Sequence, residues 1–204
     1  MKFLKACVSL LAAVSFPVFA NDIAPDAMIK QVSDEVLQIV RSDKAIQAGD
    51  MKRISEVVDA KMLPHVNFTR MTSLAVGRDW RSATPQQQAD LGAEFKTLLV
   101  RSYAGALSNY RDQQIVFKAF KMKPEETDVL VRTDVRQPGA QPVAIDYNVM
   151  KTPDGWKIYD VAVAGVSLVT NYREEFGREI RANGIDGLIK SLRDKNRSAE
   201  QAKK

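Results

Sequence analysis

The chain of 204 residues is poor in the side chains that most often bind metals or act as nucleophiles, because it contains one cysteine and one histidine. A structural zinc site needs four ligands, mostly cysteine and histidine, so the sequence excludes a site of that kind. It also lacks an H-E-x-x-H motif, a G-x-G-x-x-G motif and a P-loop, and the segment around Ser167 lacks the second glycine of a nucleophile elbow. His65 lies in a predicted loop, a setting more typical of a surface or capping residue than of a catalyst. These absences argue against enzymatic function, and no cofactor or metal is expected.

Long apolar runs are also absent, except for one at the N-terminus. Two lysines precede an apolar segment over residues 6–19, which ends in the small-x-small pattern of a signal-peptidase site at Ala20. The segment is shorter than the ~20 residues that a membrane-spanning helix needs, and Cys7 lies inside it rather than at its end, where a lipoprotein cysteine would stand. We therefore expect a signal peptide over residues 1–20 and a mature protein in the periplasm. Its only cysteine leaves with the signal, so no disulfide is expected.

A strong charge of one sign is missing as well. The formal net charge of +5 falls to +3 when the two lysines of the signal peptide leave, and the remaining Lys and Arg residues are spread along the chain among acids. This pattern argues against nucleic-acid binding and predicts an ordinary solvated surface, with weak attraction to anionic headgroups as the alternative. The length suits one domain over residues 21–195, followed by a basic flexible tail over residues 196–204.

Apolar residues at helical spacing dominate the first half of the chain. One helix is expected to begin near Pro25, a second to end at Pro64, and a third to be capped by Asn67 and to stop near Gly77. The clearest helix begins with a capping box at Thr84 and runs for about 25 residues. Its wide apolar stripe consists of Leu91, Phe95, Leu98, Leu99, Tyr103, Ala106, Leu107 and Tyr110.

The period then changes to two, which is the spacing of strands. Four alternating runs lie at residues 115–120, 129–135, 143–149 and 156–163. Short turns rich in proline, glycine and acids separate them, so we expect an antiparallel meander of four strands. Helical spacing returns after Ser167, an expected N-cap, and Asn183-Gly184 divides the last helices. Helices before and after a run of strands give an α+β fold, with helices packed on the sheet.

Two carboxylates within the strands keep an enzyme as an alternative. Asp146 alternates with apolar residues and is expected to face solvent, whereas Asp160 shares its parity with Trp156 and Ile158. A bulge, strand twist or an arginine partner would also accommodate Asp160. A general base in the cone of a curved sheet is the chemistry that such a residue would supply, so an NTF2-like enzyme acting on a small apolar substrate remains the rival function.

The strands carry apolar residues on both parities, more than a one-sided sheet needs. Helices covering both faces explain this surplus, and so does a ligand cavity.

Five segments resemble the MlaC family, the toluene-tolerance proteins that carry phospholipid in the periplasm for the Mla (maintenance of lipid asymmetry) system. These segments are residues 80–88, 155–161, 165–169, 171–173 and 184–188. The chain departs from the family at Asn67, where relatives often have aspartate, and both residue types cap helices.

The resemblance implies an NTF2-like, cystatin-related core with a strongly twisted sheet and a deep apolar cavity for the tails of a diacyl phospholipid. The residues expected to line or gate it are Phe68, Leu74, Leu98, Leu99, Tyr103, Leu107, Val131, Val135, Ile145, Tyr147, Val149, Tyr159, Val161, Val163, Val166, Leu168 and Val169. Plain core packing is the better explanation for each of them when it is taken alone. Arg81, Lys157 and Arg173 are candidates for contacts with the lipid phosphate, or simply surface residues. The implied partners are an inner-membrane Mla ABC transporter with an MCE-domain subunit and the outer-membrane lipoprotein MlaA with a porin.

Overall fold

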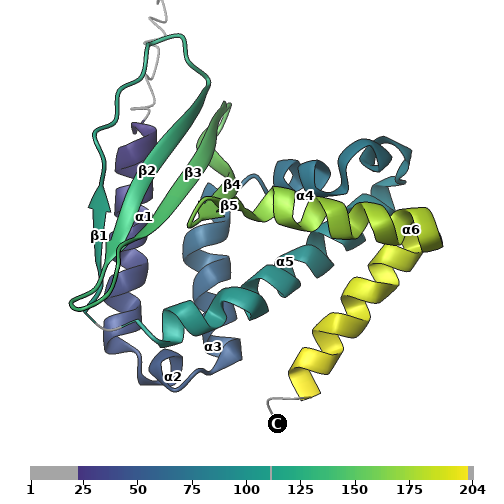
Figure 1. Cartoon of the computed structure of the whole chain (residues 1–204), viewed down its shortest axis with the longest axis horizontal. Helices are drawn as coiled ribbons and strands as arrows, with labels where there is room; N and C mark the ends of the chain where they lie inside the picture. Colours follow the sequence, from purple (N-terminus) through teal and green to yellow (C-terminus); the bar gives the residue numbers. More distant parts are fainter. Residues whose placement is uncertain (1–22, 111, 202–204) are drawn as a thin grey trace, which may run out of the picture.

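The structure is a computed structural model that describes residues 23–110 and 112–201. The predicted signal peptide lies outside the described residues. In this part of the chain, helices and one antiparallel sheet make an α+β fold (Figure 1). No helix of the described residues is long and apolar enough to cross a membrane.

The first helices lie where the apolar spacing predicts them. They are α1 (Pro25–Ser42), α2 (Lys44–Gln47) and α3 (Met51–Val57). The last of these continues into a π-helical segment, η1 (Val58–Met62), and a single 3₁₀ turn, η2 (Leu63–His65). The four-residue α2 was not expected, because it is too short to show a period. Asp43 and Asp50 cap α2 and α3, and each carboxylate accepts hydrogen bonds from two backbone N–H groups of the first turn.

The middle helices confirm the predicted caps. They are α4 (Phe68–Val76), η3 (Gly77–Ser82) and α5 (Pro85–Ser108). Asn67 Oδ1 accepts from the N–H of Arg70 at 3.0 Å. At the start of α5, Thr84 Oγ1 accepts from Gln87 N–H at 3.2 Å, and Gln87 Oε1 accepts from Thr84 N–H at 2.9 Å. Both halves of the capping box are therefore present.

The described residues form five strands in one sheet rather than the four that we expect from the sequence. The strands are β1 (Gln114–Phe117), β2 (Asp128–Arg136), β3 (Val143–Thr152), β4 (Gly155–Val163) and β5 (Val166–Ser167), paired antiparallel in that order. The fifth strand has two residues and pairs with the end of β4. A strand this short leaves no alternation in the sequence, which explains why the pattern did not predict it.

The last helix, α6 (Leu168–Gln201), is bent at Gly184, whose φ of 71° and ψ of −177° are not helical. The predicted break is thus a kink between two helical halves. Residues 196–201, which the sequence predicts as flexible tail, belong to the second half. Asn196 is buried there and its Nδ2 donates to Glu94 O at 3.0 Å and to Glu94 Oε2 at 2.8 Å.

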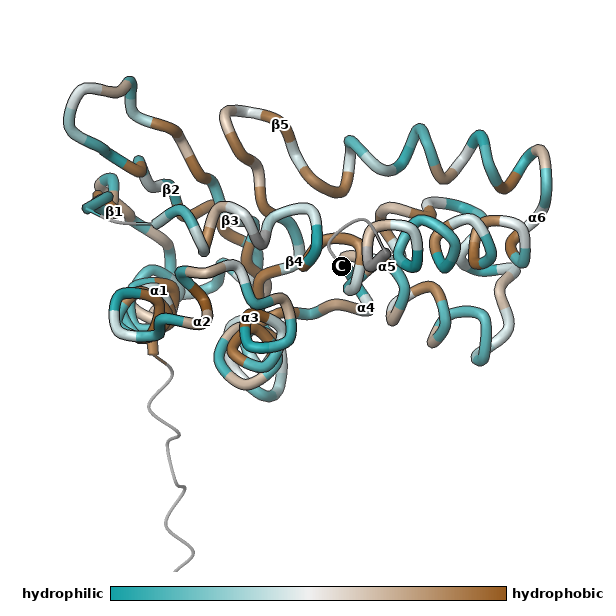
Figure 2. The backbone as a smooth tube through the Cα atoms, turned by 90° about the horizontal axis from the view of Figure 1, so that it is seen from below, coloured by the Kyte–Doolittle hydropathy of each residue, from teal (hydrophilic) through white to brown (hydrophobic). Residues whose placement is uncertain are grey.

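Three buried clusters hold these elements together. One joins α1 to the sheet, one joins α1, α2, α3 and the end of α5, and one joins α4, α5 and α6. In the third cluster, the Phe95 ring lies edge-on to Tyr172 and Phe176, each at 5.1 Å between centroids. Figure 2 shows the consequence: α1, α2 and α3 lie together along one side of the strands, while α5 and α6 extend away from them.

Candidate functional site

The sheet presents one continuous apolar face. Residues directly opposite one another on paired strands share a face, and three such rows cross the sheet: Val129–Val149–Ile158, Val131–Tyr147–Val161 and Thr133–Ile145–Val163. The next row continues with Val135 opposite Val143, and Val166 of β5 pairs with Val163. The structure therefore brings together on one face eight of the lining residues predicted from the sequence: Val131, Val135, Ile145, Tyr147, Val149, Val161, Val163 and Val166.

A β-bulge makes this face continuous. The register between β3 and β4 shifts at Asn148 and Val149, so that Asn148 lies opposite Asp160 while Val149 lies opposite Ile158. One extra residue, Tyr159, is thereby accommodated in β4. The parity of the strand changes at this point, and Val161 and Val163 join the same face as Trp156 and Ile158. Asp160 consequently lies on the opposite face, although its parity in the sequence suggests the apolar one.

Tyr159 does not join the apolar face, in contrast to its predicted place in the lining. Its hydroxyl donates to Asp128 Oδ1 at 2.8 Å, and the Arg70 guanidinium lies 6.0 Å from the centre of its ring. Burial and the hydrogen bond to Asp128 raise the pKa of Tyr159 to about 12. Because Asp128 alternates with Val129, this bond places Tyr159 on the polar side of the sheet.

The apolar face is closed at one end and accessible at the other. Met28 and Ile29 of α1 pack against the closed end, where Val131 and Val149 are buried. Five residues at the other end remain partly or fully exposed, and we call them the open end: Val135, Val143, Ile145, Val163 and Val166. Val143 and Val166 are 41% and 57% exposed. Large aliphatic side chains of this exposure, arranged next to one another on a sheet, are typical of a binding surface.

The polar atoms of the apolar face are satisfied within the protein. Thr133 is fully buried, and its Oγ1 donates to Ile145 O at 3.0 Å. Burial raises the pKa of the Tyr147 phenol, and a hydrogen bond with Thr133 partly offsets that effect. A face with apolar side chains and no unpaired charge favours an apolar ligand, because a polar ligand group would lose its hydrogen bonds to water there.

The helical residues predicted for the lining have mostly a different environment. Leu99 and Val169 are buried in the cluster of α4, α5 and α6, and four other predicted residues pack against it: Phe68, Leu74, Leu98 and Leu168. Leu107 packs against the cluster of α1, α2 and α3. Tyr103 is 40% exposed on α5. Most of these helical residues thus make contacts of core packing, which is the alternative to lipid contact that the sequence analysis gives for them.

Two of the three basic candidates bind backbone carbonyls. Lys157 Nζ donates to Pro64 O at 2.6 Å, and Arg173 Nε donates to Leu74 O at 2.8 Å. Lys157 thus ties β4 to η2, and Arg173 ties α6 to the last turn of α4. Arg81 is exposed on η3. The structure does not gather these three side chains at the open end of the apolar face.

The two strand carboxylates lie on the opposite face of the sheet. Asp160 is 7% exposed and accepts three hydrogen bonds from protein groups. Asp146 lies opposite Arg132 and Ala162, and its Oδ1 is buried without a hydrogen-bond partner in the described part of the chain. His65, in η2, has its pKa lowered by burial and then by the charge of Lys157. Among residues 23–110 and 112–201, no group of His, Cys, Asp or Glu is arranged to hold a metal ion.

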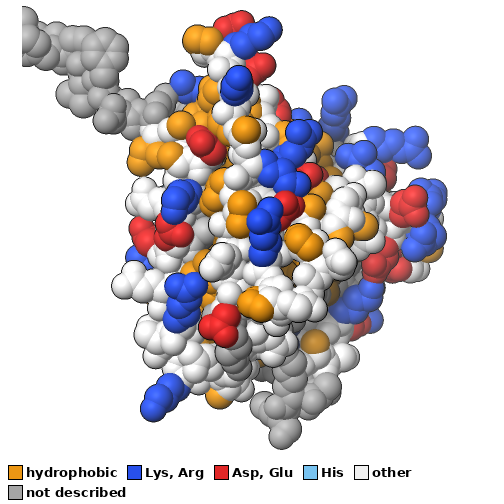
Figure 3. All heavy atoms as spheres, turned by 60° about the vertical axis from the view of Figure 1, so that its left-hand side comes forward, with side chains coloured by type: hydrophobic (Ala, Val, Ile, Leu, Met, Phe, Trp, Pro, Cys, Tyr) orange, Lys and Arg blue, Asp and Glu red, His pale blue; other side chains and the backbone are white. Residues whose placement is uncertain are grey.

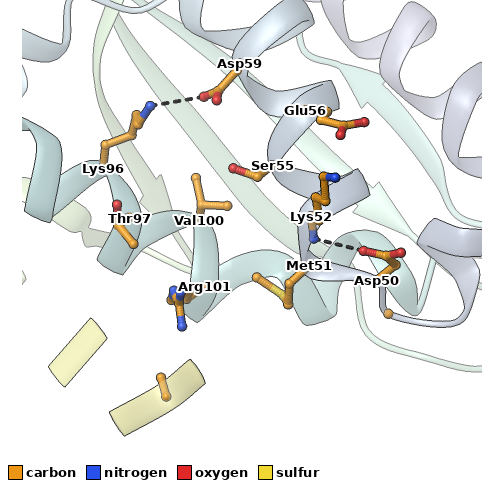
Figure 4. A pocket seen from close by; sticks show the side chains of 12 residues that line it. Asp50, Met51, Lys52, Ser55, Glu56, Asp59, Lys96, Thr97, Val100 and Arg101 are labelled. Carbon is orange, nitrogen blue, oxygen red and sulfur yellow. Dashed lines mark hydrogen bonds and ion pairs between the residues drawn. The ribbon is translucent and has the colours of Figure 1, made fainter. Parts of the chain in front are cut away.

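A separate groove of about 710 Å³ lies between α3, α5 and the end of α6. Six of its twelve lining residues are charged, and Lys96 Nζ lies 3.2 Å from Asp59 Oδ1 across it (Figure 4). It contains none of the residues predicted to bind lipid. The outer surface of the molecule has mixed charge. On the face drawn in Figure 3, hydrophobic side chains lie among basic and acidic ones, as expected for a solvated surface.

Known proteins resemble this chain over most of its length. The model of the family described as "MlaC protein" matches residues 30–194. The intermembrane phospholipid transport system binding protein MlaC of Haemophilus influenzae is 24% identical over 172 residues, which cover 83% of this chain and 80% of that protein. The toluene tolerance protein ttg2D of Pseudomonas putida is 23% identical over 179 residues, covering 87% and 82%.

A solved structure is similar in both sequence and fold. The phospholipid-binding protein of Ralstonia solanacearum, determined in complex with a phospholipid, is 39% identical to this chain. The match has a TM-score of 0.82 and covers 86% of this chain and 98% of that one.

Proposed function

This chain belongs to the MlaC family, and on that basis we propose that it carries diacyl phospholipid through the periplasm between the inner and outer membranes. The family and the relatives identify it as a phospholipid-binding transport protein of the Mla pathway. Maintenance of the lipid asymmetry of the outer membrane is the role that this activity would serve.

The observation that supports the proposal is the apolar face of the sheet with its open end. Each CH₂ group removed from water contributes roughly 0.8 kcal/mol, so a C16 acyl chain in water costs about 12 kcal/mol relative to an apolar site. A lipid with two such chains crosses an aqueous compartment only if a protein covers both of them. The rows of valine and isoleucine on β2, β3 and β4 offer that cover without an unpaired charge.

We propose that the acyl tails lie along the sheet at Ile145, Tyr147 and Val161, which are only partly buried, with the open end as the entrance. Tyr103, exposed on α5, and Leu107 would approach from the helical side. The headgroup would remain in water, so the three basic candidates Arg81, Lys157 and Arg173 are expected to contribute little to affinity. The relation of this sheet to NTF2-like and cystatin-related folds belongs to the same proposal.

The proposed partners follow from the Mla pathway. An inner-membrane ABC transporter complex with an MCE-domain subunit would exchange lipid with this protein on one side, and the outer-membrane lipoprotein MlaA with its porin on the other. The predicted signal peptide over residues 1–20 would deliver the chain to the compartment between them.

An enzyme remains the rival function, and the positions of the carboxylates argue against it. A general base must lie within hydrogen-bond reach of its substrate. Asp160 accepts bonds from three protein donors on the face of the sheet opposite the apolar one. Asp146 lies on that opposite face as well. Neither is placed to act on a ligand bound along the apolar face.

Native mass spectrometry of mature protein purified from the periplasm without detergent tests the proposal. We expect a stoichiometric adduct with the mass of a diacyl phospholipid, and Val163→Trp, which fills the open end, should abolish it. Leu130→Trp is the matched control, because Leu130 is exposed on the other face of β2. An apo mass for the wild type, with no uptake from liposomes added later, would contradict the proposal.

A further inference from the structure

Asp160 is a buried carboxylate that direct contact with lipid does not explain. A charge removed from water is costly unless hydrogen bonds replace its hydration, and here they do. Oδ2 accepts from the Ser167 hydroxyl at 2.6 Å and from Asn148 Nδ2 at 3.4 Å, and Oδ1 accepts from the Val169 N–H at 3.1 Å. One side chain of β4 is thereby bound to β3, β5 and the first turn of α6.

The same contacts cap α6. Its first N–H groups have no partner within the helix, and two of them are satisfied here, that of Val169 by Asp160 and that of Thr170 by Ser167 Oγ at 3.0 Å. The Ser167 hydroxyl donates to Asp160 while it accepts from Thr170. The predicted N-cap Ser167 is therefore one member of a chain of hydrogen bonds that starts at the buried carboxylate.

The hairpin between β4 and β5 needs such support. Its two turn residues, Ala164 and Gly165, have φ values of 50° and 82°, as in the tight type I′ turn. Glycine adopts this conformation freely, but alanine is strained in it. Ala164 N–H donates to Ala144 O at 2.8 Å, which attaches the turn to β3. Val163 and Val166, the two valines next to the turn, both belong to the open end.

We infer that Asp160 is a positioning residue for lipid retention: its carboxylate fixes the β4–β5 hairpin and the start of α6, and so holds Val163 and Val166 in place at the open end. This rests on the proposed function. When the carboxylate is lost, the hairpin moves more freely, water reaches the tails, and bound lipid leaves faster.

The direct test is Asp160→Asn, which keeps the shape of the side chain but turns one acceptor oxygen into an N–H donor. That donor would face either the Ser167 hydroxyl or the Val169 N–H. We expect lipid to leave about tenfold faster, the order of effect of losing one hydrogen bond to a charged group. The rate is measured as transfer of a fluorescent phosphatidylethanolamine from loaded protein to vesicles of phosphatidylethanolamine and phosphatidylglycerol, well below the midpoint of thermal unfolding.

Two further comparisons separate positioning from loss of stability. Glu94→Gln removes a carboxylate that binds Asn196 and Arg193 at the far half of α6, and it should lower the unfolding temperature without changing the transfer rate. Ser167→Ala should accelerate transfer, and Ser167→Thr, which keeps the hydroxyl, should restore it.

Each outcome decides something. A wild-type transfer rate in both Asp160→Asn and Ser167→Ala overturns the inference and leaves the proposed function intact, and so does equal acceleration in Glu94→Gln. If Asp160→Asn does not fold, the Ser167 pair gives the answer. Wild-type protein that never holds lipid overturns the proposed function itself.

Discussion

At the scale of single residues, the phenols of Tyr147 and Tyr159 in the sheet have raised pKa values, and the effect is largest for Tyr159. Its pKa is raised to about 12 by burial and by the hydrogen bond to Asp128, whereas an exposed tyrosine titrates at 10.0. Between these two pH values, the unfolded chain has lost the Tyr159 proton and the folded chain keeps it. The folded state thus binds more protons in this window, and its stability must fall as the pH rises.

We therefore expect the contribution of Tyr159 to stability to be fully present below pH 10 and to be lost as the pH rises from about 10 to about 12. Lysines titrate in the same range, so the measurement is a difference: denaturant unfolding of wild type and Tyr159→Phe at several pH values. The wild type should lose more stability than the variant above pH 10. Parallel curves for the two proteins would show that the phenol is not perturbed.

Residue-level patterns also show what sequence predicts well and what it does not. The capping box at Thr84 and the cap at Asn67 depend on neighbours three residues away, and both are confirmed. The face of Asp160 depends on one extra residue in the pairing of β3 with β4, which leaves no mark on the alternation. The apolar period predicted that Leu99 points inward, but not whether its neighbours would be helices or a ligand.

At the scale of elements, the kink in α6 determines which helices share a core. Gly184 has a φ of 71°, in the region that only glycine adopts without strain. Beyond the kink, Leu188 and Leu192 are buried with Phe95 of α5. A straight helix would carry these two leucines away from that core. The sequence pattern predicted the break at this glycine but not the direction of the chain after it.

Two alanine substitutions in α6 should have opposite effects. Gly184→Ala forces alanine into a backbone region, with φ of 71° and ψ of −177°, that is essentially confined to glycine, and should destabilise the protein by about 1–3 kcal/mol. Gly177→Ala is the matched control, because Gly177 is helical and its added methyl group would meet only the end of the Arg181 side chain, at 3.3 Å. It should stabilise by about 0.5–1 kcal/mol. Urea unfolding of the two variants measures both, and a stabilising Gly184→Ala would mean that the kink is not required.

At the scale of the whole molecule, ligand and fold are coupled. The open end leaves Val143 and Val166 exposed to water, so lipid bound there, as we propose, would bury apolar surface that folding alone does not. A ligand that binds only the folded state raises its stability according to ligand concentration and affinity. The unliganded protein should consequently be the less stable form, although its three core clusters remain.

Removal of lipid by solvent extraction followed by refolding should lower the unfolding temperature, and re-addition of phospholipid should restore it. A ligand present at a hundred times its dissociation constant contributes about 2.7 kcal/mol, which corresponds to several degrees in a domain of this size. Val163→Trp provides the control, because a filled open end should make the unfolding temperature independent of lipid. Equal lipid dependence in both proteins would place the binding surface elsewhere.

The bulge in β4 determines where in this strand a residue can be lost without turning the valines away from the apolar face. The first half of the strand, with Trp156 and Ile158, and the second half, with Val161 and Val163, are out of step by one residue, and Tyr159 takes up the difference. Loss of Tyr159 would bring the halves into step and keep Val161 and Val163 on the apolar face, and it would remove the hydrogen bond to Asp128 from the opposite face. Loss of a single residue two positions later would turn Val163 to the opposite face and leave Ala162 in its place on the apolar face. The effect of a one-residue deletion on the apolar face thus depends on whether it falls at the bulge or beyond it.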